Sequence, residues 1–235
     1  MSTAFEIELE MFGTEENQAQ QYFFGFLALQ IVPFRNPDVL AKMRETSMFW
    51  IATRYSLLMS AFVVLGRIFD QDQKSLHNID KLLGAVSNEI GSLNRVGLQQ
   101  RKIAAGLSPA DAANYVVGKY DLTSSDVREM RKAVSKWRHV YEAKYRDIRH
   151  KIFAHKSLNR SDAQDLMAKT DINEVKTLLG FLHSLYASLD QLYLNGIAPD
   201  LAPATFALPP ERGTSIAGEN IYRESANLLY GMLDL

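Results

Sequence analysis

Apolar residues recur along this chain at intervals of three and four, and no segment alternates apolar and polar residues at intervals of two. The first spacing places apolar side chains along one face of an α-helix, whereas the second would mark a half-buried strand. Two long stripes show the helical spacing, one from Val127 to Ile152 and one from Val175 to Leu192. We therefore predict an all-α fold, a helical bundle whose neighbouring helices run mostly antiparallel.

Local capping signals divide this bundle into about five main helices and a C-terminal helix. Asn36-Pro37 and Asn78 are typical helix starts. Asp171 with Glu174 resembles a capping box, and Asn195-Gly196 is a typical helix end. The expected helices cover residues 14–32, 36–69, 79–90, 124 or 125 to at least 152, and 171–195, with a short helix from Ser108-Pro109 and one more within 216–235.

Two features predict how these helices are organised. The segment from Phe49 to Phe69 is apolar on nearly every face, which predicts a central, buried helix. Four prolines between Pro199 and Gly213 predict an extended linker, so we divide the chain into a bundle over residues 1–198 and a linker with the C-terminal helix over residues 199–235. That last helix is expected to dock on the core or on a partner subunit, because four of its apolar residues need burial: Ile221, Leu228, Leu229 and Met232.

Composition excludes several classes of protein. The chain has no cysteine, which rules out disulfides, zinc–thiolate sites, iron–sulfur clusters and thiol catalysis. Its net charge of −1 excludes binding to nucleic acid or membranes through the overall field of the molecule. The first ten residues lack the pattern of a signal peptide, and the apolar run Leu57 to Leu65 is shorter than the ~20 residues that span a bilayer. We expect a cytoplasmic protein with no membrane partner.

Positive charge is concentrated in one segment of the chain. Residues 128–160 contain 11 lysines and arginines against 3 acidic residues, a net charge of +8, so the rest of the chain carries −9. A charge run of this kind is usually a solvated helix face that acidic neighbours balance. Here it coincides with histidines, which favours a phosphate-bearing partner.

The string Arg149 to His155 lies at the end of this basic helix pattern and joins an arginine with two histidines. At about 100° per residue, His155 lies about 20° from Ile148 and therefore continues the apolar stripe. A buried histidine satisfied by a neighbour is the simpler interpretation. Arg149 and His155 lie about 240° apart on an unbroken helix and cannot form one tight pair there. Either the helix ends near Ala154, or a second chain completes the site.

These residues resemble the motif of the HEPN superfamily, an arginine, a polar residue and a histidine late in a bundle helix. Here the motif consists of Arg149, His150, four further residues and His155. The strings RHKIFAHKS and LGRIFDQDQKSLHNIDKLL, the latter from Leu65 to Leu83, resemble the abortive-infection (AbiU-like) HEPN group. The resemblance covers roughly residues 61–194 and implies a HEPN-like core over about 36–196.

The resemblance implies a homodimer in which two motif helices build one cleft, and many such proteins are metal-independent endoribonucleases. It implies that His155 acts as general base or acid on the ribose 2′-hydroxyl, that Arg149 stabilises the charged phosphorane and that His150 supports the cleft. An unperturbed histidine titrates at about 6.5, and arginine offers a permanent fork for phosphate. We expect Arg146, Lys151 and Lys156 to bind RNA.

Several alternatives stay open at this point. Asp70 is expected to orient Arg149 or a histidine, although Asp70 and Asp72 at a helix end more simply form a salt-bridge cluster. We expect no metal and no cofactor. The cleft is expected to act on RNA, in a toxin or antiphage effector that an antitoxin or neutralising protein controls. The alternatives are a non-catalytic dimer that binds a nucleotide or a partner, and a monomer with His155 in its own core.

Overall fold

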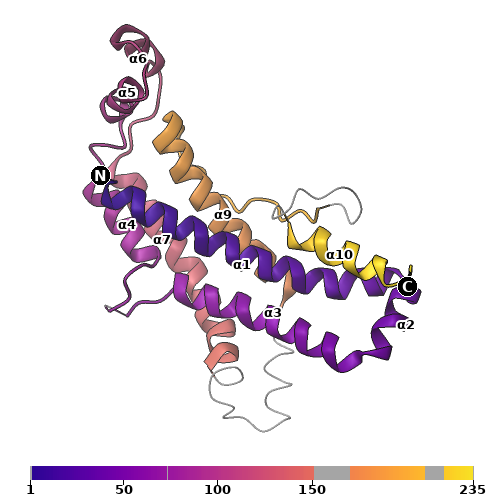
Figure 1. Ribbon diagram of the computed structural model, residues 1–235. Coiled ribbons are helices and arrows are strands. Elements are labelled where there is room, and N and C mark those ends of the chain that lie inside the picture. The colour runs from indigo at the N-terminus through magenta and orange to yellow at the C-terminus, as the bar shows by residue number, and fades with distance from the viewer. Residues whose placement is uncertain (1, 73, 151–169, 210–219, 235) are drawn as a thin grey trace.

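The computed structural model describes residues 2–72, 74–150, 170–209 and 220–234, and all regular secondary structure in these ranges is helical (Figure 1). The prediction of an all-α fold is confirmed. The helices are α1 Ala4–Arg35, α2 Pro37–Glu45, α3 Ser47–Ile68, α4 Ile79–Asn88, α5 Arg95–Ala104, α6 Pro109–Tyr115, α7 Ser124–Val140, the π-helix η1 Tyr141–Tyr145, α9 Ile172–Asn195 and α10 Ile221–Gly231.

The long helices α1 and α3 lie side by side and antiparallel, and α2 joins them at one end (Figure 1). At the other end α4, α7 and α9 pack against this pair, while α5 and α6 project from the bundle as an arm (Figure 1). One large apolar core runs through α1, α3, α4, α7 and α9. This arrangement places the helix that carries the motif against the C-terminal half of α3.

The first helix begins at Ala4, ten residues before the predicted start at Thr14. Thr3 and Glu6 form a capping box at its true start, in which the Thr3 hydroxyl accepts the Glu6 N–H at 3.2 Å. Thr14 lies inside the helix, where its hydroxyl donates to the Glu10 carbonyl at 3.0 Å. The early start is stabilised by the burial of Phe5, so the expected start at Thr14 was wrong.

The predicted helix over residues 36–69 is two helices, because the backbone leaves the helical region at Thr46 (φ −127°, ψ 42°). The predicted start is confirmed, since the Asn36 side chain accepts the N–H groups of Asp38 and Val39 at 3.1 and 3.4 Å. The break lets α2 turn the chain so that α3 returns along α1.

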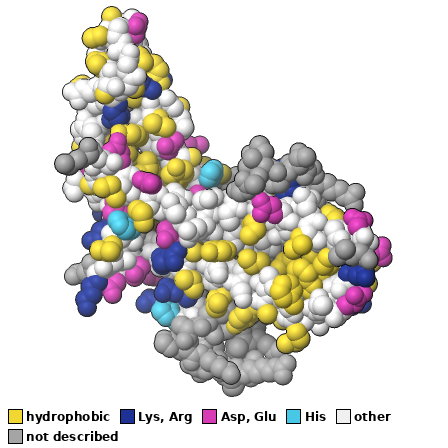
Figure 2. Space-filling view, viewed as in Figure 1, with side chains coloured by type: hydrophobic (Ala, Val, Ile, Leu, Met, Phe, Trp, Pro, Cys, Tyr) yellow, Lys and Arg dark blue, Asp and Glu magenta, His cyan; other side chains and the backbone are white. Residues whose placement is uncertain are grey.

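Only the C-terminal half of α3 is buried, which corrects the prediction of a buried central helix. Leu58 and Phe62 are 4% and 0% exposed, whereas Met48 and Phe49 are 76% and 60% exposed. The N-terminal half extends past α4 and α7. Its Trp50 and Leu57 pack against a small apolar cluster of α1, α2 and α10, and Figure 2 shows an apolar patch over α1 and α3 there. An 18-residue window of α3 has a mean hydropathy of 1.6 and is 28% buried, so by length and composition alone this helix could cross a membrane.

The two halves of α3 are expected to respond differently to the same substitution. Phe62→Ala removes a ring from the core and is expected to lower the free energy of unfolding by about 3–5 kcal/mol. Phe49→Ala removes an exposed ring and is expected to change it by less than about 0.5 kcal/mol. Urea unfolding of both variants checks this, and a comparable loss in Phe49→Ala would show that a partner covers the exposed half.

The segment between α4 and α7 is more helical than the sequence suggested. The predicted short helix is confirmed as α6, and the Ser108 hydroxyl accepts the Asp111 N–H at its start. Helix α5 was not predicted, although Asn94 caps it by accepting the Gly97 N–H at 2.9 Å. Together the two helices form the projecting arm.

The C-terminal helix docks on α1 of its own chain, through the buried residues Tyr222, Ala226 and Leu229. Leu228 is 62% exposed within the single chain, so its expected burial stays a prediction that only a partner subunit could fulfil. The segment after α9 is extended and packs on the bundle, where the Ser184 hydroxyl donates to the Ala202 carbonyl at 2.7 Å. Phe206 stacks on Phe24 of α1, with ring centroids 4.9 Å apart.

Candidate functional site

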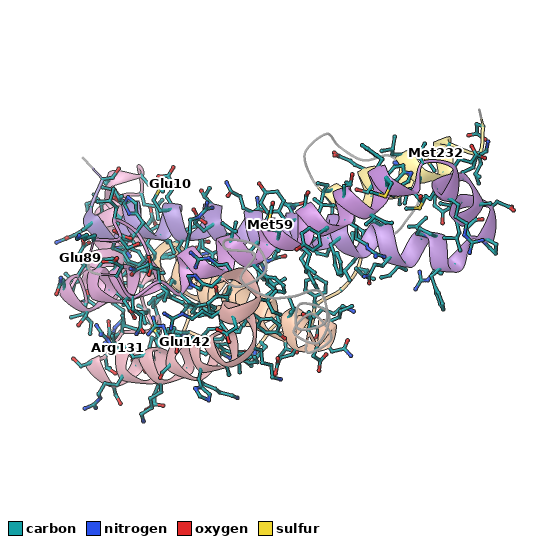
Figure 3. The ribbon with its side chains drawn as sticks, turned by 90° about the horizontal axis from the view of Figure 1, so that it is seen from below. Glu10, Met59, Glu89, Arg131, Glu142 and Met232 are labelled. Carbon is teal, nitrogen blue, oxygen red and sulfur yellow. The ribbon has the colours of Figure 1, made fainter. Side chains whose placement is uncertain are left out.

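The candidate site lies where the basic helix meets α3. Thr123 and Asp126 form a capping box at the start of α7, and Val127, Met130 and Val134 are buried on its apolar face. Figure 3 views this helix from below, with Arg131 and Glu142 marking its course. The predicted apolar stripe therefore faces the core up to the end of α7.

The helix then changes to π geometry in η1, where the Arg146 N–H donates to the Tyr141 carbonyl. This wider turn puts two tyrosine rings on α3: Tyr141 stacks on Phe69 at 5.4 Å and Tyr145 on Phe62 at 5.3 Å between ring centroids. Residues 148–150 are also π-helical. Such turns are rare and frequent at functional sites, and this one directly precedes the motif.

Helix α9 fixes the same turn from the other side. The Tyr145 hydroxyl donates to a Glu174 carboxylate oxygen at 2.7 Å, and Lys144 pairs with the other oxygen at 2.7 Å. Burial and this carboxylate raise the pKa of Tyr145 far above its ordinary value, so the hydroxyl stays a donor. Asp171 caps α9 and Gly196 ends it in the left-handed region (φ 62°), as predicted. The Glu174 carboxylate contacts Tyr145 and Lys144 on the motif helix. This contact between helices replaces the expected capping box.

A cleft of about 380 Å³ opens beside this turn. Its walls come from the C-terminal end of α3 with the residues after it, and from η1 with the residues after it; they are Gly66, Phe69, Asp70, Gln71, Asp72, Tyr141, Glu142, Arg146, Arg149 and His150. Arg146 is exposed, whereas Arg149 and His150 are half-buried. The structure thus brings together three of the predicted site residues, Arg146, Arg149 and His150, and Asp70 from the segment that follows α3.

Asp70 lies in the cleft, but its recorded hydrogen bond is local. Its carboxylate accepts the Asp72 N–H at 3.1 Å, and the Asp72 carboxylate accepts the Lys74 N–H at 2.9 Å. These contacts form consecutive turns after α3. Burial raises the pKa of the Tyr141 hydroxyl, and the negative charge of Asp70 adds a smaller contribution in the same direction. A role of Asp70 in orienting Arg149 or a histidine stays a prediction.

His155, Lys151 and Lys156 lie outside the described residues, so the geometry that relates them to Arg149 stays an expectation. Within the described ranges no group of three histidine, aspartate or glutamate side chains could hold a metal ion. His77 contacts Glu8 at 3.1 Å and His183 contacts Glu16 at 3.4 Å, both outside the cleft. His139 is exposed, as predicted.

Part of the basic cluster is balanced by neighbouring carboxylates, as a solvated helix face would be. Arg138 pairs with Asp80 of α4 at 2.8 Å, and Lys132 pairs with Glu129 at 2.7 Å. Arg146 and Arg149 lie instead on the cleft. The fold therefore brings two arginines of the basic cluster into a concave surface, together with the carboxylates of Asp70, Asp72 and Glu142.

Two residues of the cleft were missed by sequence reasoning. Tyr141 was expected to serve core or dimer packing, and Gly66 was not singled out. A methyl group built on Gly66 would lie 2.7 Å from Cζ of Arg149, so this glycine is needed for the approach of the arginine. An isolated glycine within a helical pattern can mark such a close approach, but the pattern does not name the partner.

Comparison with known families gives one match. The model of the HEPN_AbiU2 family, described as AbiU2, matches residues 35–208. The matched region extends from the end of α1 to the segment after α9 and includes every residue of the cleft. No curated protein and no solved structure matches the chain.

Proposed function

Because the chain belongs to the AbiU2 family of HEPN proteins, we propose that it is a metal-independent endoribonuclease that acts as a homodimer in abortive infection. The observation that carries the proposal is the half-buried Arg149 in a concave cleft, six residues before His155 in the matched region. The cleft combines a fixed cation with groups able to transfer protons, which phosphodiester cleavage requires.

In the proposed reaction the ribose 2′-oxygen attacks the adjacent phosphorus while His155 removes its proton. The bond from phosphorus to the 5′-oxygen breaks, and a protonated histidine supplies the proton to this leaving oxygen. The Arg149 guanidinium binds the charged phosphorane, and Arg146, Lys151 and Lys156 hold the flanking phosphates. The nucleophile belongs to the substrate, so no metal ion is needed to generate it.

A homodimer supplies the second histidine that this scheme uses. If the chain continued as a regular α-helix, Arg149 and His155 would be about 240° out of phase and would point about 120° apart, which disfavours a complete site within one copy. Two motif helices related by a two-fold axis would place the arginine of one copy near the histidine of the other. A neutralising protein that covers this shared cleft would silence the enzyme.

The test is incubation of the purified chain with total RNA and transfer RNA in the presence of EDTA. We expect cleavage that leaves a 2′,3′-cyclic phosphate, and no cleavage of a substrate with 2′-deoxyribose at the cleaved position, because the attacking oxygen is then missing. Cleavage that EDTA abolishes, or that the deoxy substrate still undergoes, would contradict the proposed chemistry.

One observation favours a second candidate, a non-catalytic dimer that binds a nucleotide. The volume of the cleft, about 380 Å³, lies within the range of small-molecule sites. Carboxylates of Asp70, Asp72 and Glu142 line it opposite or beside the arginines, and carboxylates accept hydrogen bonds from ribose hydroxyls and base amino groups. Calorimetric titration with mononucleotides distinguishes the two, since this candidate requires tight binding and no RNA cleavage.

A further inference from the structure

The guanidinium of Arg149 rests at a helix position that has room for it only because the residue there is glycine. Gly66 is buried in α3, and a methyl group at this position would lie 2.7 Å from Cζ of Arg149. Packed carbon atoms keep about 3.5–4.0 Å apart. Gly66 therefore leaves a notch in the surface of α3, and the end of the Arg149 side chain fills it.

Tyr141 forms the second wall of this notch. The same methyl group would lie 2.8 Å from the Tyr141 hydroxyl oxygen, so the hydroxyl and the guanidinium meet at the same point of α3. The tyrosine ring is 3% exposed and stacks on Phe69, which leaves it little freedom to move. Its hydroxyl is buried without a well-directed hydrogen bond to the described residues and can accept one from the adjacent guanidinium.

We propose that Gly66 and Tyr141 are positioning residues that hold the Arg149 guanidinium in the orientation that receives the RNA phosphate. This inference rests on the proposed function. An arginine side chain in solution samples many rotamers. When Arg149 is held against α3 before RNA binds, its side chain does not lose rotamer freedom in the chemical step. Arg149 also lines the cleft with Arg146 and His150, where its guanidinium is available to a bound phosphate.

Gly66→Ala tests the notch directly. The atoms that the new methyl group meets first belong to the flexible end of Arg149, and the Tyr141 hydroxyl at 2.8 Å has to shift by a few tenths of an ångström, so the variant is expected to fold with the guanidinium displaced. We expect the cleavage rate to fall about 10- to 100-fold, as for a misplacement of about 1 Å, with little change in melting temperature. The control is Gly84→Ala in α4, where the methyl group has no neighbour within 4 Å and no loss of activity is expected.

A double-mutant cycle separates positioning from general damage. If Gly66 acts through Arg149, Gly66→Ala causes no further loss of activity in a chain that already carries Arg149→Ala. The same fold loss in both backgrounds would mean that Gly66 acts independently of the arginine, and the proposal would be overturned.

A measurement without RNA keeps this inference distinct from the proposed function. The Nε–Hε NMR signal of Arg149, identified by its loss in Arg149→Ala, is expected to exchange slowly in the wild type and to shift or broaden in Gly66→Ala. An absent wild-type signal, or one unchanged in the variant, overturns the positioning role. A clear change in a chain that cleaves no RNA supports the positioning and overturns the ribonuclease proposal instead.

Tyr141→Phe provides the test should Gly66→Ala fail to fold. This variant keeps the buried ring and its stack on Phe69 and removes only the hydroxyl oxygen. The Arg149 signal is expected to change in the same direction, with a smaller loss of cleavage rate than in Gly66→Ala. An unchanged Arg149 signal together with an unchanged cleavage rate would overturn the role of Tyr141.

Discussion

The variant His155→Ala is expected to lose RNA cleavage by about 10²- to 10⁴-fold, the contribution that a positioned general acid or base makes. Its melting temperature is expected to stay close to that of the wild type, since the proposed role is in proton transfer. The matched control is His139→Ala, which removes an exposed histidine near the end of α7, two residues before η1, and is expected to leave the rate unchanged. Undiminished cleavage by His155→Ala would exclude this histidine from the chemistry.

The same variant tests whether two copies share one cleft. After equal amounts of wild type and His155→Ala are refolded together, random pairing makes about a quarter of the dimers fully wild type. Activity of about a quarter is expected if each site needs the histidines of both copies. Activity of about a half would mean that each site needs only one histidine, contrary to the proposal that both copies supply the acid and the base.

Features of the fold that depend on a few neighbouring residues were predictable from the sequence. Asn78 caps α4 by accepting the Lys81 N–H at 2.9 Å, and Gly196 ends α9, both as local chemistry requires. The start of α1 was misplaced because two plausible N-terminal signals compete, one at Thr3 and one at Thr14. The choice between them depends on the burial of Phe5, which is decided by helices distant in sequence.

Features that depend on the packing of whole helices were not predictable. An apolar run indicates that a helix can be buried but does not reveal where its neighbours end, so Phe49 was expected inside and lies 60% exposed. The candidate site shows the same limit. A motif in the chain picked out Arg149 and His150, whereas Gly66 and Tyr141 become part of the site only when the π turn of η1 meets α3.

The variant Arg149→Ala is expected to lower kcat by about 10²- to 10³-fold, the loss found when one donor to a developing oxyanion is removed. Because the arginine binds the phosphorane more strongly than the ground-state phosphate, KM is expected to change much less than kcat. Single-turnover cleavage at saturating enzyme, compared with RNA affinity at the same salt concentration, separates the two quantities.

Two further variants decide whether charge or geometry matters at this position. Arg128→Ala removes an equal charge from an exposed site at the start of the same helix and is expected to weaken RNA binding slightly without changing kcat. Arg149→Lys keeps the charge but loses the planar fork, so it is expected to stay close to Arg149→Ala in kcat. If lysine restored the wild-type rate, a point charge at this position would suffice for catalysis. The proposed orientation of the guanidinium by Gly66 and Tyr141 would then have no catalytic role.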